Sequence, residues 1–548
     1  MATPEDWKAK GQAKLASTNS KIPAAWRLPT DLLQDGGLTS ARNVLAIPRE
    51  SGLLTARELE LTETYDATDL VQKLASGEVR AEELTIAFCK RAAIAQQLTS
   101  CLTEIFFEEA IERAKDLDAY LKREGKPIGP LHGLPISLKD CFNVKGQYAT
   151  VGFVSFIDKP VADMNSVLPD ILYKYGAVFY VKTNIPQTLM TGDSENNVFG
   201  RTLNPHKLFL GAGGSSGGEG ALIAQRGSVL GLGTDIGGSI RIPAFVNGIY
   251  GFKGTVGRLP YAGQQQFTRK GRTGIAPCAG PLGVSLRDLE MIFKLVSAAD
   301  PWLYDEGVIS VPWRDLPPPT QDKKLRFGVI TEDPKSPIHP PMLRALKTAT
   351  KALAAAGNIL VPLDRQIPSL YDGFILASKA FMTDNKMTPF QHMAASGEPP
   401  IPSIATLQME EMKDWQISLD EMWEINAERE QVRTSWRKLW AENSLDAVVM
   451  VPHAGTAQRH DKYGLPPYTV VANVLDYPAA VIPFLKASKE LDAPYVRNGG
   501  AFVNRRPEYD PEACEGMPCA IQLLGRPMHE EELMQHLKTV DIILKTAA

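Results

Sequence analysis

Apolar positions recur at helical spacing in the first quarter of the chain. From about residue 60 to residue 122, positions such as Leu70, Leu74 and the 84–88 block follow this spacing, and Ser76-Gly77 divides the stretch into two helices. The preceding segment Thr55-Ala-Arg-Glu58 has the pattern of a capping box, which predicts a helix start. Residues 1–50 are polar and contain several prolines, and they predict an arm with one short helix.

From about residue 130, short apolar runs alternate with Gly, Pro and helical stretches. A helix is expected over residues 342–356. Buried strands are expected over residues 177–181, 228–232, 325–330, 359–362 and 445–451. This alternation predicts the α/β class, with a large mixed, mainly parallel β-sheet covered by helices on both faces.

The expected organisation is an N-terminal arm over residues 1–60 and a single α/β domain over residues 61–548. The section from about 320 to 440 is more helical and is expected to shape the substrate site. Trp436 and Trp440, four residues apart in this section, fit either core packing or the wall of an aromatic pocket.

Composition is that of a globular protein, with 548 residues, 44% hydrophobic, 22% charged and a formal net charge of −4. No basic stretch stands out, so nucleic acid is not an expected partner. Six scattered cysteines without a CxxC pair predict reduced thiols. The charged N-terminus and the lack of a long apolar run predict neither a signal peptide nor a transmembrane helix, and the expected location is cytoplasmic. Whether the chain forms a homodimer is left open by the sequence.

Two glycine-serine segments are the most unusual feature of the sequence. They span residues 211–220 and 231–241. Glycine runs let backbone N–H groups point together into a cavity, as an oxyanion hole requires. Neither segment has the ending of a P-loop or the GxGxxG spacing of a dinucleotide site, so nucleotide binding is not expected.

Each segment offers a candidate nucleophile. Ser215 lies in a GxSxG pattern, but residues 204–210 before it read as a loop rather than a strand, and no histidine downstream is supported as its base. Ser239 follows Gly237-Gly238, where the backbone N–H groups from Ile236 to Ser239 can converge on one oxygen. A tight glycine-packed turn with a buried serine explains that second segment equally well.

Lys139 ends the apolar run Leu131-His-Gly-Leu-Pro-Ile-Ser-Leu-Lys139. A lysine in apolar surroundings loses its proton more readily, because burial disfavours the charged form. In its neutral form it can act as a general base.

Together, three segments resemble the amidase signature family. They are Gly-Leu-Pro-Ile-Ser-Leu-Lys139-Asp, Gly-Gly-Ser215-Ser-Gly-Gly-Glu-Gly and Gly-Thr-Asp-Ile-Gly-Gly-Ser239-Ile-Arg, in the family's order and spacing. The resemblance covers roughly residues 60–540. In length and in the details of its sequence, the chain is most similar to the fungal acetamidases. The resemblance implies the amidase-signature fold, and neither a metal nor another cofactor.

The resemblance also implies roles for individual residues. Ser239 would be the acylated nucleophile, Ser215 the bridging serine in a cis peptide and Lys139 the base. Leu189 lies where the family contacts its substrate. The oxyanion hole would be Ile236, Gly237, Gly238 and Ser239, and the supporting residues Ser216, Asp235 and Arg241.

The expected reaction is hydrolysis of a small-molecule carboxylic amide to a carboxylate and ammonia or an amine. Three other functions stay open at this point. The chain could be an amidase or esterase for a bulky aryl or secondary-metabolite acyl group, the catalytic subunit of an amidotransferase, or a non-catalytic relative. The intact lysine and serines argue against the last.

Overall fold

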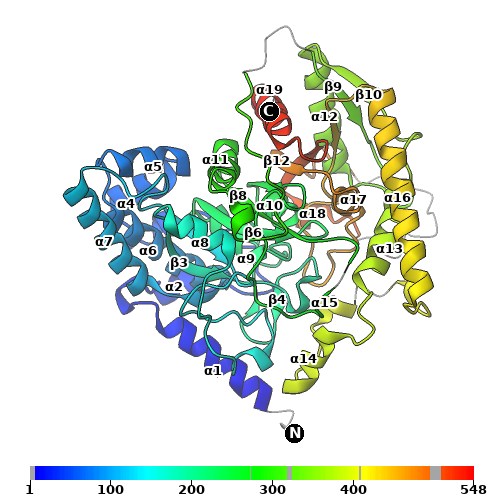
Figure 1. The fold of residues 1–548 in the computed structure, drawn as a ribbon. Coiled ribbons are helices and arrows are strands. Elements are labelled where there is room, and N and C mark those ends of the chain that lie inside the picture. Colours follow the sequence, from blue (N-terminus) through cyan, green and yellow to red (C-terminus); the bar gives the residue numbers. More distant parts are fainter. Residues whose placement is uncertain (1–5, 272, 318–323, 406–408, 494–507, 548) are drawn as a thin grey trace.

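The computed structural model describes residues 6–271, 273–317, 324–405, 409–493 and 508–547. Its centre is an eleven-stranded sheet in the order β1-β3-β2-β6-β8-β7-β12-β13-β11-β9-β10 (Figure 1). The strands are β1 (Leu102–Ile105), β2 (Pro135–Lys139), β3 (Val178–Thr183), β6 (Leu230–Asp235), β7 (Tyr250–Lys253), β8 (Cys278–Gly283), β9 (Arg326–Val329), β10 (Ile359–Pro362), β11 (Ala447–Met450), β12 (Ala479–Lys486) and β13 (Pro518–Leu524). A separate short hairpin pairs β4 (Glu195–Asn196) with β5 (Gly200–Arg201).

Helices surround this sheet. Those of the first 125 residues gather on one side of the molecule, and α13 and α16 lie on the opposite side (Figure 1). The helices are α1 (Asp6–Ser20), α2 (Thr30–Leu33), α3 (Ile47–Glu50), α4 (Ala56–Glu63), α5 (Ala67–Ala75), α6 (Ala81–Thr99), α7 (Phe107–Glu124), α8 (Val167–Lys174), α9 (Gly217–Ala224), α10 (Arg241–Val246), α11 (Leu286–Ser297), α12 (Pro340–Ala355), α13 (Leu370–Phe381), α14 (Thr388–Ser396), α15 (Pro402–Ala405), α16 (Leu419–Glu442), α17 (Pro467–Leu475), α18 (Pro511–Cys514) and α19 (Glu530–Ala547).

Both faces of the sheet are covered. Every residue of β2, β3, β6, β8 and β13 is buried. Because successive side chains of a strand point to opposite faces, burial at every position requires packing on both sides. The predicted α/β class with a large mixed sheet is therefore confirmed.

Parallel pairing is less extensive than expected. It joins β2 to β3 and β6, and β9 to β10 and β11, whereas the strands between these two blocks pair antiparallel. A strand buried on both faces is a continuous apolar run in either orientation, so its residue pattern carries no information about direction.

The predicted strands and the two helices divided at Ser76-Gly77 are present, and Thr55 and Glu58 form the predicted capping box. The arm differs, because it contains the fifteen-residue helix α1 and two shorter helices. Helix α1 fully buries only Gly11 and Thr18, and the Thr18 hydroxyl donates to the carbonyl of Thr103 (3.1 Å). On the same face, Trp7 and Leu15 are partly buried against another apolar cluster. Because small residues alternate with these two apolar residues, the hydrophobic period of the helix is weak.

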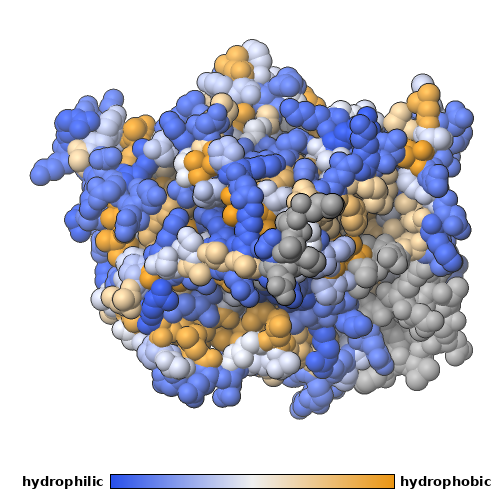
Figure 2. Space-filling model, turned by 90° about the horizontal axis from the view of Figure 1, so that it is seen from below, coloured by the Kyte–Doolittle hydropathy of each residue, from blue (hydrophilic) through white to orange (hydrophobic). Residues whose placement is uncertain are grey.

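Trp436 and Trp440 belong to the main core, where both rings meet Tyr477 edge-on. All six cysteines are unpaired and buried. Hydrophilic side chains predominate on the face shown in Figure 2, where apolar residues form separate patches. Among the described helices, none combines the length and apolar character that crossing a membrane requires.

Candidate active site

Lys139 is the last residue of β2 and is completely buried. Its ammonium nitrogen donates to the Ser215 hydroxyl oxygen (2.7 Å) and to the Thr234 hydroxyl oxygen (2.8 Å). Burial lowers the pKa of Lys139 to about 8, although Cys141, Asp235 and Glu219 act in the opposite direction. This lysine therefore loses its proton more readily than an exposed one.

Ser215 precedes helix α9 and follows a cis peptide bond from Gly214. A side chain at Gly214 would overlap the carbonyl oxygen of Thr191, so only glycine permits this approach of the two loops. The Ser194 hydroxyl fixes the loop further, since it donates to the carbonyl of Gly213 (2.9 Å) and accepts from the N–H of Gly217 (3.0 Å). Hydrogen bonds on both sides of Ser215 therefore fix the turn that carries it.

Ser239 lies between β6 and α10 and is 9% exposed. Its carbonyl accepts from the Ser216 N–H (3.2 Å), which joins the two glycine-serine segments. In the part of the chain that the structure describes, no hydrogen bond links the Ser215 and Ser239 hydroxyls. Lys139 and Ser215 are therefore in direct side-chain contact. Ser239 is connected to the Ser215 loop through a backbone hydrogen bond.

Asp235 and Arg241 form a buried ion pair beside these serines. The guanidinium contacts both carboxylate oxygens, at 3.0 and 3.1 Å. Burial alone would raise the pKa of Asp235, but Arg241 holds it well below its usual value. The carboxylate also accepts from the N–H groups of Gly238 (2.8 Å) and Ile240 (3.1 Å), so it fixes the turn that carries Ser239.

Three residues from the last part of the chain complete this network, and sequence reasoning had not singled them out as site residues. Arg241 donates to the carbonyl of Thr469 (2.8 Å) and to the side-chain oxygens of Asn473 (2.8 Å) and Gln522 (2.7 Å). Together with the bonds to Asp235, these bonds engage Nε and both terminal nitrogens of the buried guanidinium. These partners offset the free-energy cost of burying the cation.

Arg241→Ala is expected to lower the free energy of unfolding by about 3–5 kcal/mol, because it leaves the Asp235 carboxylate buried without its cation. Urea denaturation followed by circular dichroism measures this change. Arg123→Ala is the control, since Arg123 forms an exposed pair with Glu124 and its loss should change stability little. Equal stability of Arg241→Ala and the wild type would contradict the assigned role.

The turn from Ile236 to Gly238 is the predicted oxyanion loop. Gly238 has a φ of +123°, a conformation that favours glycine, and its N–H is engaged by Asp235. A side chain at Gly237 would reach Val470 at 3.5 Å and Phe381 at 3.9 Å, so an apolar wall adjoins the turn. The described geometry therefore leaves Ile236, Gly237 and Ser239 as candidate donors.

The remaining predicted residues have less direct placements. Ser216 contributes its backbone N–H, whereas its buried hydroxyl has no hydrogen-bond partner among the described residues. Leu189 is buried in the main core with a left-handed φ of +60°. Its neighbour Gln187 bonds to Glu398 (2.9 Å) and to the N–H of Ile401 (3.1 Å), so this loop is tied to the helical section predicted to shape the site.

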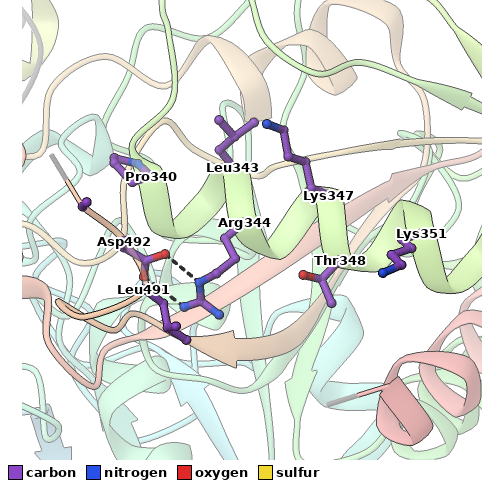
Figure 3. Close-up of a pocket in the computed structure, with 9 residues that line it drawn as sticks. Pro340, Leu343, Arg344, Lys347, Thr348, Lys351, Leu491 and Asp492 are labelled. Atoms are coloured by element: carbon purple, nitrogen blue, oxygen red, sulfur yellow. Dashed lines mark hydrogen bonds and ion pairs between the residues drawn. The ribbon is translucent and has the colours of Figure 1, made fainter. Parts of the chain in front are cut away.

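A hollow of about 420 Å³ lies elsewhere, along helix α12 (Figure 3). Arg344 faces it and is paired with Asp492. None of the residues that line this hollow belongs to the serine–lysine cluster.

Comparison with known proteins identifies the class that this fold and cluster define. The chain is 40% identical over 542 residues to an amidase of Gibberella moniliformis, covering 98% of this chain and 99% of the relative. It is 38% identical to an acetamidase of Emericella nidulans, covering 99% of each chain. A solved structure of a fatty acid amide hydrolase superposes with a TM-score of 0.89 at 31% identity, covering 98% of this chain and 95% of that one. The protein is an amide hydrolase.

The family follows from a separate match. The chain belongs to the Amidase family, whose model matches residues 83–534. The resemblance read from the three sequence segments is thereby confirmed.

Proposed function

We propose that this enzyme hydrolyses carboxylic amides through an acyl-enzyme on Ser239, with Ser215 as the bridging serine and Lys139 as the base. The 2.7 Å contact between the buried Lys139 nitrogen and the Ser215 hydroxyl carries this proposal. It supports a base role because a buried lysine with a lowered pKa has a neutral form available near neutral pH.

In the proposed cycle, neutral Lys139 accepts the proton of Ser215, and Ser215 accepts that of Ser239. Ser239 then attacks the amide carbonyl carbon. The relay returns a proton to the leaving nitrogen as the carbon–nitrogen bond breaks, because an amine anion leaves poorly. Water repeats the sequence on the acyl-enzyme and releases the carboxylate.

The negative oxygen formed during attack needs hydrogen-bond donors. We assign this task to the N–H groups of Ile236, Gly237 and Ser239, because Asp235 engages that of Gly238. Asp235 and Arg241 would support the site by fixing this turn. Leu189 is proposed as a substrate contact.

Small aliphatic amides are the proposed substrates, on the strength of the similarity to the acetamidase. The apolar wall of Val470 and Phe381 beside Gly237 favours a second candidate, amides with a larger apolar acyl group. Ammonia release from a panel of primary amides, from acetamide to long-chain and aryl amides, distinguishes the two. Activity confined to short chains supports the first, and rates that rise with acyl size support the second.

Ser215→Ala tests the relay. It is expected to slow labelling by a fluorophosphonate by about 10²–10⁴-fold without abolishing it, because the nucleophile remains while its proton path is cut. The labelling rate and the labelled peptide are measured by mass spectrometry. A complete loss of label, with the wild-type label mapped to Ser215, would instead make Ser215 the nucleophile.

A further inference from the structure

Glu219 is a buried carboxylate in the first turn of α9, four residues after Ser215. Its two oxygens accept from the hydroxyls of Ser137 on β2 (2.6 Å) and Thr183 at the end of β3 (2.8 Å). One carboxylate thus connects three elements of the fold. The proposed catalytic cycle does not use this carboxylate.

The elements that Glu219 connects also carry the proposed relay. Ser137 is two residues before Lys139 on β2, so their side chains leave the strand on the same face. Ser215 immediately precedes α9, the helix that carries Glu219. The carboxylate therefore fixes β2 relative to α9. Lys139 at the end of β2 and Ser215 just before α9 form the hydrogen bond described above.

The charge of Glu219 is also uncompensated by any direct partner. Among the described residues it forms no ion pair, whereas Asp235 is paired with Arg241, and Asp140 lies 3.9 Å from Lys182. The partners of Glu219 are neutral hydroxyls, so its negative charge is available to raise the pKa of Lys139.

Other groups on the packed elements do not offset this charge. Apart from the Asp140–Lys182 pair, the charged or titratable groups around α9 and Lys139 are Cys89, Tyr180, Cys101, Cys141, Asp235, Arg241, Arg91 and Arg226. The phenol and the three thiols are neutral because burial raises their pKa values. Asp235 and Arg241 balance each other, Arg91 pairs with Glu63, and Arg226 lies near the carboxylates of Asp288, Glu63 and Asp66.

We propose that Glu219 is a positioning residue for the base: it fixes β2 and β3 against α9, and its negative charge sets the pH range in which Lys139 is neutral. This inference rests on the proposed function, since it takes Lys139 as the base. Burial raises the pKa of Glu219 to about 7 against the hydrogen bonds of Ser137 and Thr183 and the charge of Lys139, so the two groups titrate as a coupled pair.

Glu219→Gln tests the proposal, because the amide can keep hydrogen bonds to both hydroxyls while the charge is lost. A lost anion no longer stabilises the Lys139 ammonium, so the lysine becomes neutral at lower pH. The midpoint of the acid limb of the fluorophosphonate labelling rate is expected to fall by about one pH unit. A purely structural role would lower the rate equally at every pH and leave the midpoint unchanged.

Two further variants keep the test decisive. Ser137→Ala removes one donor to the carboxylate, which then takes up a proton more readily and stabilises the lysine cation less. The midpoint of the acid limb is therefore expected to fall by a smaller amount in Ser137→Ala. This variant provides the test if Glu219→Gln does not fold. Glu398→Gln is the matched control, because Glu398 is another buried carboxylate with neutral donors, and its loss should not move the midpoint.

An unmoved midpoint in a folded Glu219→Gln protein overturns the proposal; if that variant does not fold, an unmoved midpoint in Ser137→Ala does so. The proposed function is tested separately by labelling of Ser239→Ala in the same series. If that variant is still labelled, the relay itself is wrong. If it is unlabelled while the Glu219 midpoint stays fixed, only the role of Glu219 fails.

Discussion

Replacing Ser239 with alanine is expected to abolish covalent labelling by a fluorophosphonate and to lower kcat for amide hydrolysis by about 10⁴–10⁶-fold. The reason is that the variant keeps the turn, the Asp235–Arg241 pair and the Lys139–Ser215 contact, but has no oxygen to form the acyl-enzyme. KM should change little, because the proposed mechanism assigns this hydroxyl to bond formation with the carbonyl carbon rather than to holding the substrate. Intact-mass spectrometry and steady-state ammonia release measure the two effects.

Ser378→Ala is a suitable control for the loss of a buried hydroxyl. Ser378 lies on α13 and donates to a carbonyl of its own helix (2.8 Å), so its removal should leave labelling intact. Residual labelling of Ser239→Ala on the peptide that contains Ser215 would contradict the assignment and would move the nucleophile to the other glycine-serine segment.

Lys139→Met is expected to reduce kcat/KM by about 10²–10⁴-fold, the range typical of losing a general base. In the wild type the rate should rise with pH to half its maximum near pH 8, because the pKa of Lys139 is lowered to about 8 and only the neutral amine accepts a proton. Below that pH the ammonium form predominates and the rate falls. The acid limb due to this group should be absent in Lys139→Met, as a pH–rate profile shows.

A second buried lysine provides the control. Lys182 on the neighbouring strand β3 is also fully buried and lies near Asp140. Lys182→Met should cost stability by leaving that carboxylate unpaired, yet the acid limb should stay in place. A wild-type rate and limb in Lys139→Met would show that another group is the base.

The apolar runs of the sequence predict five strands of the sheet, which are β3, β6, β9, β10 and β11. The motifs of the sequence also identify the segments that carry Lys139, Ser215 and Ser239. Apolar runs and glycines are local signals, so a few consecutive residues are enough to predict a buried strand or a tight turn. Strand direction was beyond this reasoning, because it depends on connections tens of residues long. The length of helix α1 was also not predicted, since only Trp7 and Leu15 give its packed face an apolar signal.

The residues that complete the site show a different limit. Gln522 is a lone amide inside the apolar strand β13, and a buried polar group needs a partner, so a signal was present. The identity of that partner, Arg241, depends on the fold, because the two residues are 281 positions apart. Thr234 carried no signal, since a threonine at the end of a strand is ordinary.

The long separation between Arg241 and Gln522 has a consequence for the protein while it is being made. When the ribosome has synthesised both glycine-serine segments, three acceptors of the guanidinium are still untranslated. They are Thr469, Asn473 and Gln522. At about 5–20 residues per second, the wait is on the order of tens of seconds. During this interval Arg241 and Asp235 lack these later partners. A nascent or prematurely terminated polypeptide therefore carries the three residues of the proposed relay without the complete hydrogen-bond network of Arg241.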